Sequence, residues 1–177
     1  MKESVVFTYG RFNPPHLGHK MMIEEMMKLN KKVVVVVSHS QDNNKNPLSV
    51  TDKIRILKTW FPKLDVRASS KNMSIAKIAE NFSEDSVMVV GEDRAKAFNF
   101  IPVQKRTVTR PPGAPSATRA RNAARAGNIA TFRNLTGYNN EKIIKKIRGS
   151  PKSQPPKSKT PKNGSPKVGT RRSTRRV

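Results

Sequence analysis

The chain of 177 residues has no cysteine, only 12 acidic residues and no long apolar run. The lack of cysteine excludes a disulfide framework and fits a reducing compartment. No apolar stretch approaches the ~20 residues that span a bilayer, and no signal peptide precedes the first apolar segment. We therefore expect an intracellular, cytoplasmic protein without a membrane span, with the nucleus or a virion as alternatives that the basic carboxyl-terminal tail suggests.

Basic residues greatly outnumber acidic ones, since 36 Lys+Arg stand against 12 Asp+Glu and give a net charge of +24. Ten basic residues and no acidic residue follow Ile147, so residues 1–147 carry 26 basic and 12 acidic groups, or +14. Such charge attracts polyanions, including nucleotides, nucleic acids and acidic membranes. Because Pro, Ser, Lys and Gly dominate from Gly149 onward, we expect one domain over residues 1–148 and a disordered tail over 149–177.

The apolar pattern alternates between strand and helix over the first 90 residues. Apolar runs predict four strands, at residues 3–8, 33–37, 64–68 and 86–90, and the unbroken valine run at 33–37 is typical of a parallel strand that is buried on both faces. Helical spacing predicts helices over 20–30, over 50–61 after Ser49, and after Ser74. This alternation predicts an α/β fold, a doubly wound parallel sheet with helices on both faces.

The turn after the first predicted strand, Tyr9-Gly-Arg-Phe-Asn-Pro-Pro-His-Leu-Gly-His19, is the most informative segment. Its two histidines lie near a helix N-terminus, where unpaired N–H groups and the helix dipole already favour anions. An imidazole can also carry a positive charge near neutral pH. The pattern predicts a phosphate-binding site. A metal site and a capping loop with incidental histidines are the alternatives, and the absence of acidic residues between Glu3 and Glu24 disfavours the metal.

A second candidate site follows the rigid loop at residues 111–115. Ser116 suits a helix N-cap, Thr118 lies in the first turn, and Arg121 is one turn further along the same face. The planar fork of an arginine can hold two phosphate oxygens, although this pattern alone favours a capped surface helix. Gly91 and Asp93, at the end of the fourth strand, are placed for ligand contact or for a plain surface turn.

Residues 10–19 resemble the first motif of the HxGH nucleotidylyltransferase (cytidylyltransferase-like) superfamily, G-x-F-N-P-x-H-x-G-H, without a mismatch. They look closest to nicotinamide mononucleotide adenylyltransferases and their viral and phage relatives. Ser116, Thr118 and Arg121 match the second signature, I-S-[SAG]-T-x-[IV]-R, from which Pro115 and Ala120 depart at two aliphatic positions. The resemblance covers about residues 4–147. It implies a Rossmann-like fold and an enzyme that transfers the nucleoside monophosphate of ATP or CTP to a phosphorylated small molecule and releases pyrophosphate.

The resemblance also implies residue roles. The expected catalytic residues are His16, His19 and Arg121. The residues expected to bind the nucleotide are Thr8, Gly10, Arg11, Phe12, His16, His19, Ser116, Thr118 and Arg121. The residues expected to bind the acceptor are Asn13, Lys45, Gly91 and Asp93. Magnesium is the expected cofactor, held by phosphate oxygens and water and not by a dedicated acidic pair. Nicotinamide mononucleotide is the leading acceptor, with a pantetheine phosphate or another viral or phage-specific phosphate compound as alternatives.

The tail supports a hypothesis of another class. It contains three [ST]-P-K units and ends in Arg171-Arg-Ser-Thr-Arg-Arg176, a composition typical of DNA-compacting tails and nuclear-import signals. A solubilising polycation is the simpler alternative. On this hypothesis the chain is a nucleic-acid-binding or virion-associated basic protein on a degenerate nucleotidyltransferase scaffold. The presence of both histidines, Thr118 and Arg121 favours the enzyme.

Overall fold

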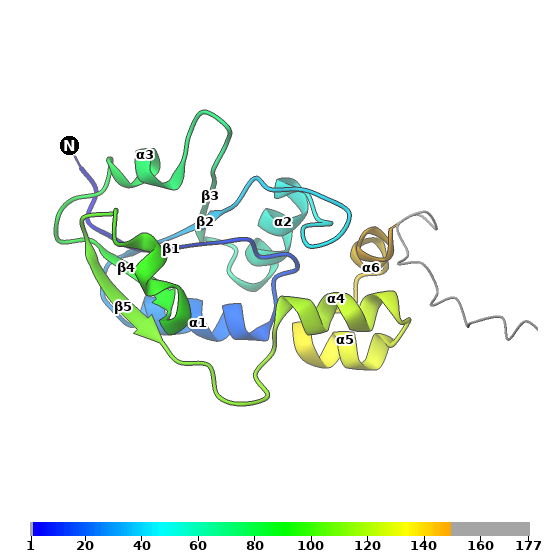
Figure 1. Cartoon of the computed structure of the whole chain (residues 1–177). Coiled ribbons are helices and arrows are strands. Elements are labelled where there is room, and N and C mark those ends of the chain that lie inside the picture. The colour runs from blue at the N-terminus through cyan, green and yellow to red at the C-terminus, as the bar shows by residue number, and fades with distance from the viewer. Residues whose placement is uncertain (1, 150–177) are drawn as a thin grey trace, which may run out of the picture.

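The computed structural model of the chain describes residues 2–149 and contains one sheet of five parallel strands (Figure 1). The strand order is β3-β2-β1-β4-β5, with β1 (Val5–Gly10), β2 (Lys32–Val37), β3 (Asp65–Ala68), β4 (Val87–Gly91) and β5 (Gln104–Val108). β1 pairs with β2 along its whole length and with β4 on its other side. The predicted α/β, Rossmann-like sheet is therefore confirmed, and the strand order reverses between β1 and β4.

Helices cover both faces of the sheet, as predicted. Alternate residues of β1 point to opposite sides, so that Val5 and Phe7 pack in one apolar cluster and Val6 packs in another. The first cluster includes residues of α3 (Ile75–Ala79) and of the 3₁₀ helix η1 (Glu92–Phe98), and the second includes residues of α1 (Leu17–Met27) and α2 (Val50–Trp60). The histidine turn thus leaves the centre of the sheet at its carboxyl edge.

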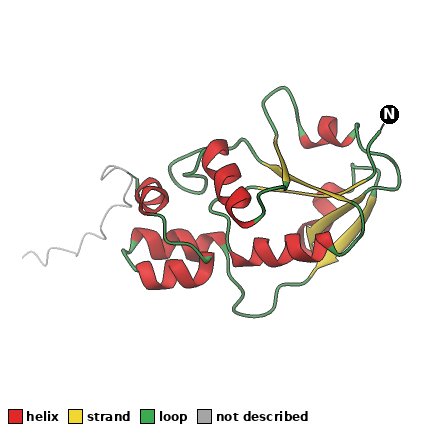
Figure 2. Cartoon of the chain, turned by 180° about the vertical axis from the view of Figure 1, so that it is seen from behind, coloured by secondary structure: helices red, strands yellow, loops and turns green. Residues whose placement is uncertain are grey.

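Three further helices form a separate group to one side of the sheet (Figures 1 and 2). They are α4 (Ala117–Arg125), α5 (Ile129–Thr136) and α6 (Glu141–Arg148). The small side chains of Ala120, Ala123 and Ala124 let α4 lie close to its neighbours, and the apolar face of α6 completes this third cluster together with Leu48 and Ile56. The three helices therefore pack against α2 and the loop after β2, and α4 connects them to the last strand of the sheet.

Several elements differ from the sequence prediction. α1 begins at Leu17 and not at Lys20, because His16 acts as its N-cap, so His19 lies inside the first helical turn. The short α3 ends at Ala79, although Phe82 beyond it is still buried. β5 was not predicted, because this edge strand is largely exposed and its sequence, Gln104-Lys-Arg-Thr-Val108, contains no apolar run. The short helices η1, α5 and α6 were not predicted either.

The predicted tail lies outside the described residues, apart from Gly149. Within residues 2–149, no helix is both long enough and apolar enough to cross a bilayer.

Gly137 provides a test of how α5 packs against α1. It ends α5 in the left-handed region, with a φ of 78°, and an added Cβ would lie 2.7 Å from Leu17 Cδ2. Gly127 has a similar φ of 74° but open space around it. We expect Gly127→Ala to lower the free energy of unfolding by about 1 kcal/mol through backbone strain alone. Gly137→Ala should lower it by about 1 kcal/mol more, because Leu17 must move. If urea titrations give the two variants the same loss in free energy of unfolding, the contact between Gly137 and Leu17 is contradicted.

Candidate active site

His16 and His19 hold the first turn of α1 by hydrogen bonds from backbone N–H groups to their rings. His16 Nδ1 accepts a bond from the Gly18 N–H at 3.0 Å, and His19 Nδ1 accepts one from the His16 N–H at 3.1 Å. The two rings stack with their centroids 3.7 Å apart, and the Phe12 ring packs at a tilt against His19, with centroids 4.4 Å apart. A Cβ on Gly18 would lie 2.8 Å from His16 Cε1, so a glycine is required there.

These bonds assign the tautomer of both imidazoles. Because each Nδ1 accepts a hydrogen bond, each ring is neutral and carries its proton on Nε2. The electrostatics agree, since burial and the positive charge of Arg110 lower the pKa of His16 to about 4. Burial, His16 and Arg110 also hold the pKa of His19 well below its usual value. The histidines therefore act as neutral N–H donors in the free protein, not as the charged rings that their sequence context allows.

A cavity of about 250 Å³ lies in front of the two histidines. It is lined by the end of β1, the histidine turn, the end of β4 with η1, and the start of α4. No carboxylate lines the cavity. Its charged lining residues are four arginines from four separate segments, Arg11, Arg94, Arg110 and Arg121. A positively charged hollow with neutral imidazole donors at a helix N-terminus is suited to a polyphosphate.

The start of α4, which carries the second motif, faces the histidine turn. Ser116 is the N-cap and its hydroxyl accepts from the Arg119 N–H at 3.1 Å. Arg121 donates from Nη1 to the Asn13 carbonyl at 2.9 Å and from Nη2 to the Thr118 hydroxyl at 3.3 Å. Ser116, Thr118 and Arg121 all line the cavity. Residues a hundred positions apart in the sequence are thereby brought to one site.

The other predicted site residues fall into two groups. Thr8, Gly10, Arg11, Phe12, Asn13 and Gly91 also line the cavity. Two of these have polar groups that are already engaged, because the Thr8 hydroxyl donates to the Val89 carbonyl at 2.7 Å and the Asn13 amide bonds both backbone groups of Leu48. Lys45 and Asp93 are exposed and do not line it.

Two lining arginines escaped the sequence analysis. Arg94 is in η1 and stands 5.9 Å from the Phe98 ring centroid, and Arg110 follows β5. Neither has an ion-pair partner among residues 2–149. In a chain with 36 basic residues, no local pattern marks these two. For Arg94, a basic residue soon after the predicted fourth strand was the available signal, because ligands bind at the carboxyl edge of such sheets. Arg110 had no such signal, because it follows β5, which was not predicted.

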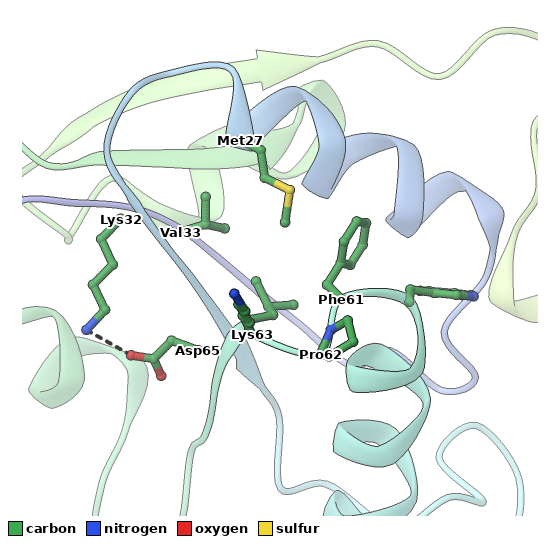
Figure 3. A pocket seen from close by; sticks show the side chains of 9 residues that line it. Met27, Lys32, Val33, Phe61, Pro62, Lys63 and Asp65 are labelled. Atoms are coloured by element: carbon green, nitrogen blue, oxygen red, sulfur yellow. Dashed lines mark ion pairs between the residues drawn. The ribbon is translucent and has the colours of Figure 1, made fainter.

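A larger hollow, of about 460 Å³, lies at the amino-terminal ends of β2 and β3, away from the carboxyl ends that carry the histidine turn (Figure 3). Its lining is mainly apolar, with Trp60 and Phe61 from the end of α2 and Met27 from the end of α1. Its rim carries an ion pair of 3.1 Å between Lys32 and Asp65. It contains neither histidine nor arginine, so the chemistry for holding phosphates belongs to the smaller cavity.

The cavity offers a divalent cation no direct carboxylate ligand. No group of three or more His, Asp or Glu side chains that could hold a metal occurs among residues 2–149. Hard cations such as magnesium take oxygen ligands and keep several waters. The lining therefore fits a cation that arrives with its phosphates, and magnesium in this role stays a prediction.

Comparison with known families gives a match over the sheet. The family model described as Cytidylyltransferase-like matches residues 7–111, which run from β1 past the end of β5. The chain belongs to the cytidylyltransferase-like family. This confirms the resemblance that residues 10–19 carry. The second motif, Ser116 to Arg121, lies beyond the matched segment of this cytidylyltransferase-like chain, so its role depends on the geometry of the cavity.

Individual proteins are similar to this cytidylyltransferase-like chain at low identity or over a short segment only. It is 34% identical over 58 residues to nicotinamide-nucleotide adenylyltransferase of Aeropyrum pernix, a match that covers 32% of this chain and 34% of that protein. A bifunctional NMN adenylyltransferase/ADP ribose pyrophosphatase from Francisella tularensis, complexed with AMP and a manganese ion, aligns with a TM-score of 0.60 and 18% identity over 82% of this chain and 51% of that one. TmcAL of Thermotoga maritima, bound with alpha-thio ATP, gives 0.57 and 12% over 80% and 55%. The chain thus spans about half of each of these solved chains, and these likenesses show a shared fold.

The pKa of His16 makes the fold sensitive to acid. Because its pKa in the folded chain, about 4, is below the ordinary 6.5, the unfolded chain binds a proton more readily between these values. The contribution of His16 to the free energy of unfolding is therefore complete above pH 6.5 and decreases by up to about 3 kcal/mol as the pH drops towards 4.

We expect His16→Asn, which keeps an N-cap acceptor, to reduce this loss in urea titrations at pH 7, 5.5 and 4.5. A loss in His16→Asn as large as in the wild type would show that His16 is not the responsible group.

Proposed function

We propose that this protein is a nucleotidyltransferase that transfers a nucleoside monophosphate, AMP from ATP in the first instance, to a phosphorylated small molecule. The observation that carries the proposal is the pair of neutral, stacked imidazoles that faces Thr118 and Arg121 across one carboxylate-free cavity. Family membership supports it, because the matched segment includes the complete first motif. CTP is the alternative donor.

The reaction is an in-line displacement at phosphorus. A phosphate oxygen of the acceptor forms a bond to the α-phosphorus, the bond from that phosphorus to the bridging α–β oxygen breaks, and pyrophosphate leaves with that oxygen. No protein atom needs to form a covalent bond, so catalysis consists of positioning and charge stabilisation. The Nε2–H groups of His16 and His19 donate to the α and β phosphates. Thr118 and Arg121 hold the β and γ phosphates.

Arginines supply the positive charge that the neutral histidines do not. A phosphate monoester carries about −1.5 to −2 near neutral pH, and the triphosphate adds more, so two anions must be brought together. The four lining guanidinium groups oppose this charge, and they keep their own charge at any physiological pH. We assign Arg94 and Arg110 to this task in addition to Arg11 and Arg121.

Magnesium is the proposed cofactor, carried by the triphosphate oxygens and water. When bound, it would shield the phosphates and stabilise the pyrophosphate as it leaves. The manganese ion reported with the Francisella tularensis enzyme supports a divalent cation of this kind.

The acceptor is proposed from resemblance. Nicotinamide mononucleotide leads, because the first motif looks closest to that branch and the Aeropyrum pernix relative is a nicotinamide-nucleotide adenylyltransferase. Gly91 at the cavity wall is the best placed of the predicted acceptor residues. Asn13 can contribute little beyond its backbone, since Leu48 occupies its amide. Lys45 and Asp93 require a loop movement or a long acceptor to take part.

Nucleic-acid contact is a second proposed activity, for which the charge of α4–α6 is the specific observation. Residues 117–149 contain eight basic side chains and one acidic one, a net charge of +7. We propose that residues 1–148 form the nucleotidyltransferase domain and that residues 149–177, with nine more basic side chains, extend this positive charge towards DNA or RNA. A nuclear or virion location would follow from such contact, and the compartment stays a prediction.

Substitution of the histidines tests the enzyme proposal. His16→Ala and His19→Ala should each lower kcat for pyrophosphate release by at least tenfold, about 1.4 kcal/mol of barrier, because a donor to the transferring phosphate is lost. The assay combines ATP or CTP, magnesium and a panel of phosphorylated acceptors. His39→Ala serves as the control and should retain the wild-type rate.

A smaller effect would refute these histidine roles. If the wild-type chain binds neither triphosphate in the presence of magnesium, yet binds DNA with a steep salt dependence, the chain is a basic binding protein on an inactive scaffold.

Arg110 gives a prediction with two readouts. We expect Arg110→Gln to raise the KM for the triphosphate or the acceptor roughly tenfold, the effect of about 1.4 kcal/mol of binding. It should also move the pKa of His16 upwards in an NMR titration, because the positive charge of Arg110 contributes to lowering it. Arg106→Gln, on the exposed edge strand β5, is the control and should change neither value. An unchanged His16 titration in Arg110→Gln would place Arg110 away from the histidines.

A further inference from the structure

The turn between β1 and α1 is held by side chains that lie far from it in the sequence. Three of its carbonyls, those of Arg11, Asn13 and Pro15, each accept a hydrogen bond from another element. Lys53 Nζ in α2 donates to the Arg11 carbonyl at 2.9 Å, and Tyr138 Oη, between α5 and α6, donates to the Pro15 carbonyl at 2.8 Å. The third donor is Arg121, already assigned to the phosphates.

The turn has few bonds of its own to fix its shape. Pro14 and Pro15 have no N–H to donate, and Phe12 has a φ of 47°, in the left-handed region that a phenylalanine adopts only when its surroundings impose it. The histidines come directly after these residues. Their position therefore depends on the donors that reach the turn from outside.

Lys53 is fully buried, and no carboxylate pairs with it among residues 2–149. Its amine bonds the carbonyls of Arg11 and Ser38, which follow the ends of the neighbouring strands β1 and β2. Burial lowers the pKa of this amine to about 8, which reflects how unfavourable the place is for a charge. An apolar side chain of similar length would fill the same space without that cost, so the amine serves the geometry of the two strand ends.

Tyr138 reaches the turn from the segment between α5 and α6. Its ring lies edge-on to Phe132, with centroids 5.7 Å apart, and its centroid lies 5.9 Å from that of the Trp60 ring. Burial raises the pKa of the Tyr138 hydroxyl, so it remains a donor at every physiological pH. Tyr138 lies outside the segment that the family model matches.

We infer that Lys53 and Tyr138 are positioning residues that hold the His16–His19 turn in register with the phosphate-binding start of α4. This inference rests on the proposed nucleotidyl transfer. Neither side chain lines the cavity. Their loss should therefore misalign the imidazoles for the transition state more than it weakens ground-state binding, which also uses Thr118 and the four arginines.

The test uses variants of the full chain that remove one donor each. Tyr138→Phe removes only the hydroxyl, and Trp60→Phe is its matched control, because Trp60 packs against the same ring without bonding the turn. We expect Tyr138→Phe to lower kcat roughly tenfold with a change in the triphosphate KM below about threefold, since small misplacements of catalytic groups cost this much. Trp60→Phe should leave kcat within about twofold of the wild type.

The absence of cysteine from the chain allows a rescue experiment at Lys53. Lys53→Cys should lower kcat as Tyr138→Phe does. Alkylation of the unfolded variant with 2-bromoethylamine forms one S–C bond with loss of bromide and restores an amine at lysine length. After refolding, kcat should return to at least about half of the wild-type value, whereas alkylation with iodoacetamide should not restore it.

A readout without turnover separates this inference from the proposed function. In the free protein, the Nε2–H signals of His16 and His19 should shift or broaden in Tyr138→Phe and stay unchanged in Trp60→Phe. If these signals and kcat are unchanged in folded Tyr138→Phe, or if Trp60→Phe loses as much activity, the inference is wrong. If the signals move but the wild-type chain transfers no nucleotide to any acceptor, the turn is positioned as inferred and the proposed function fails.

Discussion

The hydrogen bonds that the His16 and His19 imidazoles accept from the backbone of Gly18 and His16 are the constraint on which the rest of the site depends. Each imidazole uses Nδ1 to accept a backbone N–H in the first turn of α1, which leaves both Nε2–H groups as donors. The same bonds fix where the helix starts and why Gly18 must be a glycine, since a Cβ there would meet the His16 ring. The tautomer, the helix start and the direction of two donors therefore follow from a single arrangement.

This arrangement divides the electrostatic work of the site between two residue types. A protonated His16 or His19 would carry a hydrogen on Nδ1 and would lose its cap bond, so charging these rings opposes the fold of the turn. The positive charge is supplied instead by guanidinium groups, which do not titrate in this range. A cavity with neutral donors and fixed cations keeps the same charge pattern over several pH units, which suits two anionic reactants.

The features that could be predicted from the sequence are those with a local signature. The valine run of β2 and the caps at Ser49 and Ser116 were predicted where they occur, because each depends on residues within a few positions. The edge strand β5 was missed because its register comes from pairing with β4 and not from its own composition. The first helix was placed three residues late because histidine is not an expected N-cap.

In the site, too, the residues with a local motif could be predicted, and those that act from a distant part of the chain could not. That His16 and Arg121 would line the same cavity was expected only through resemblance, because no local rule relates residues a hundred positions apart. Lys53 appears in the sequence as one more lysine of an amphipathic helix, and Tyr138 lies in a segment with no motif, yet both bond the turn that carries the histidines. The family match ends at residue 111, whereas two of the three side chains that donate to carbonyls of that turn, Arg121 and Tyr138, come after it. The matched segment therefore contains the histidine turn and Lys53, and the helices that follow it contribute Thr118 and Arg121 to the cavity and Tyr138 to the support of the turn.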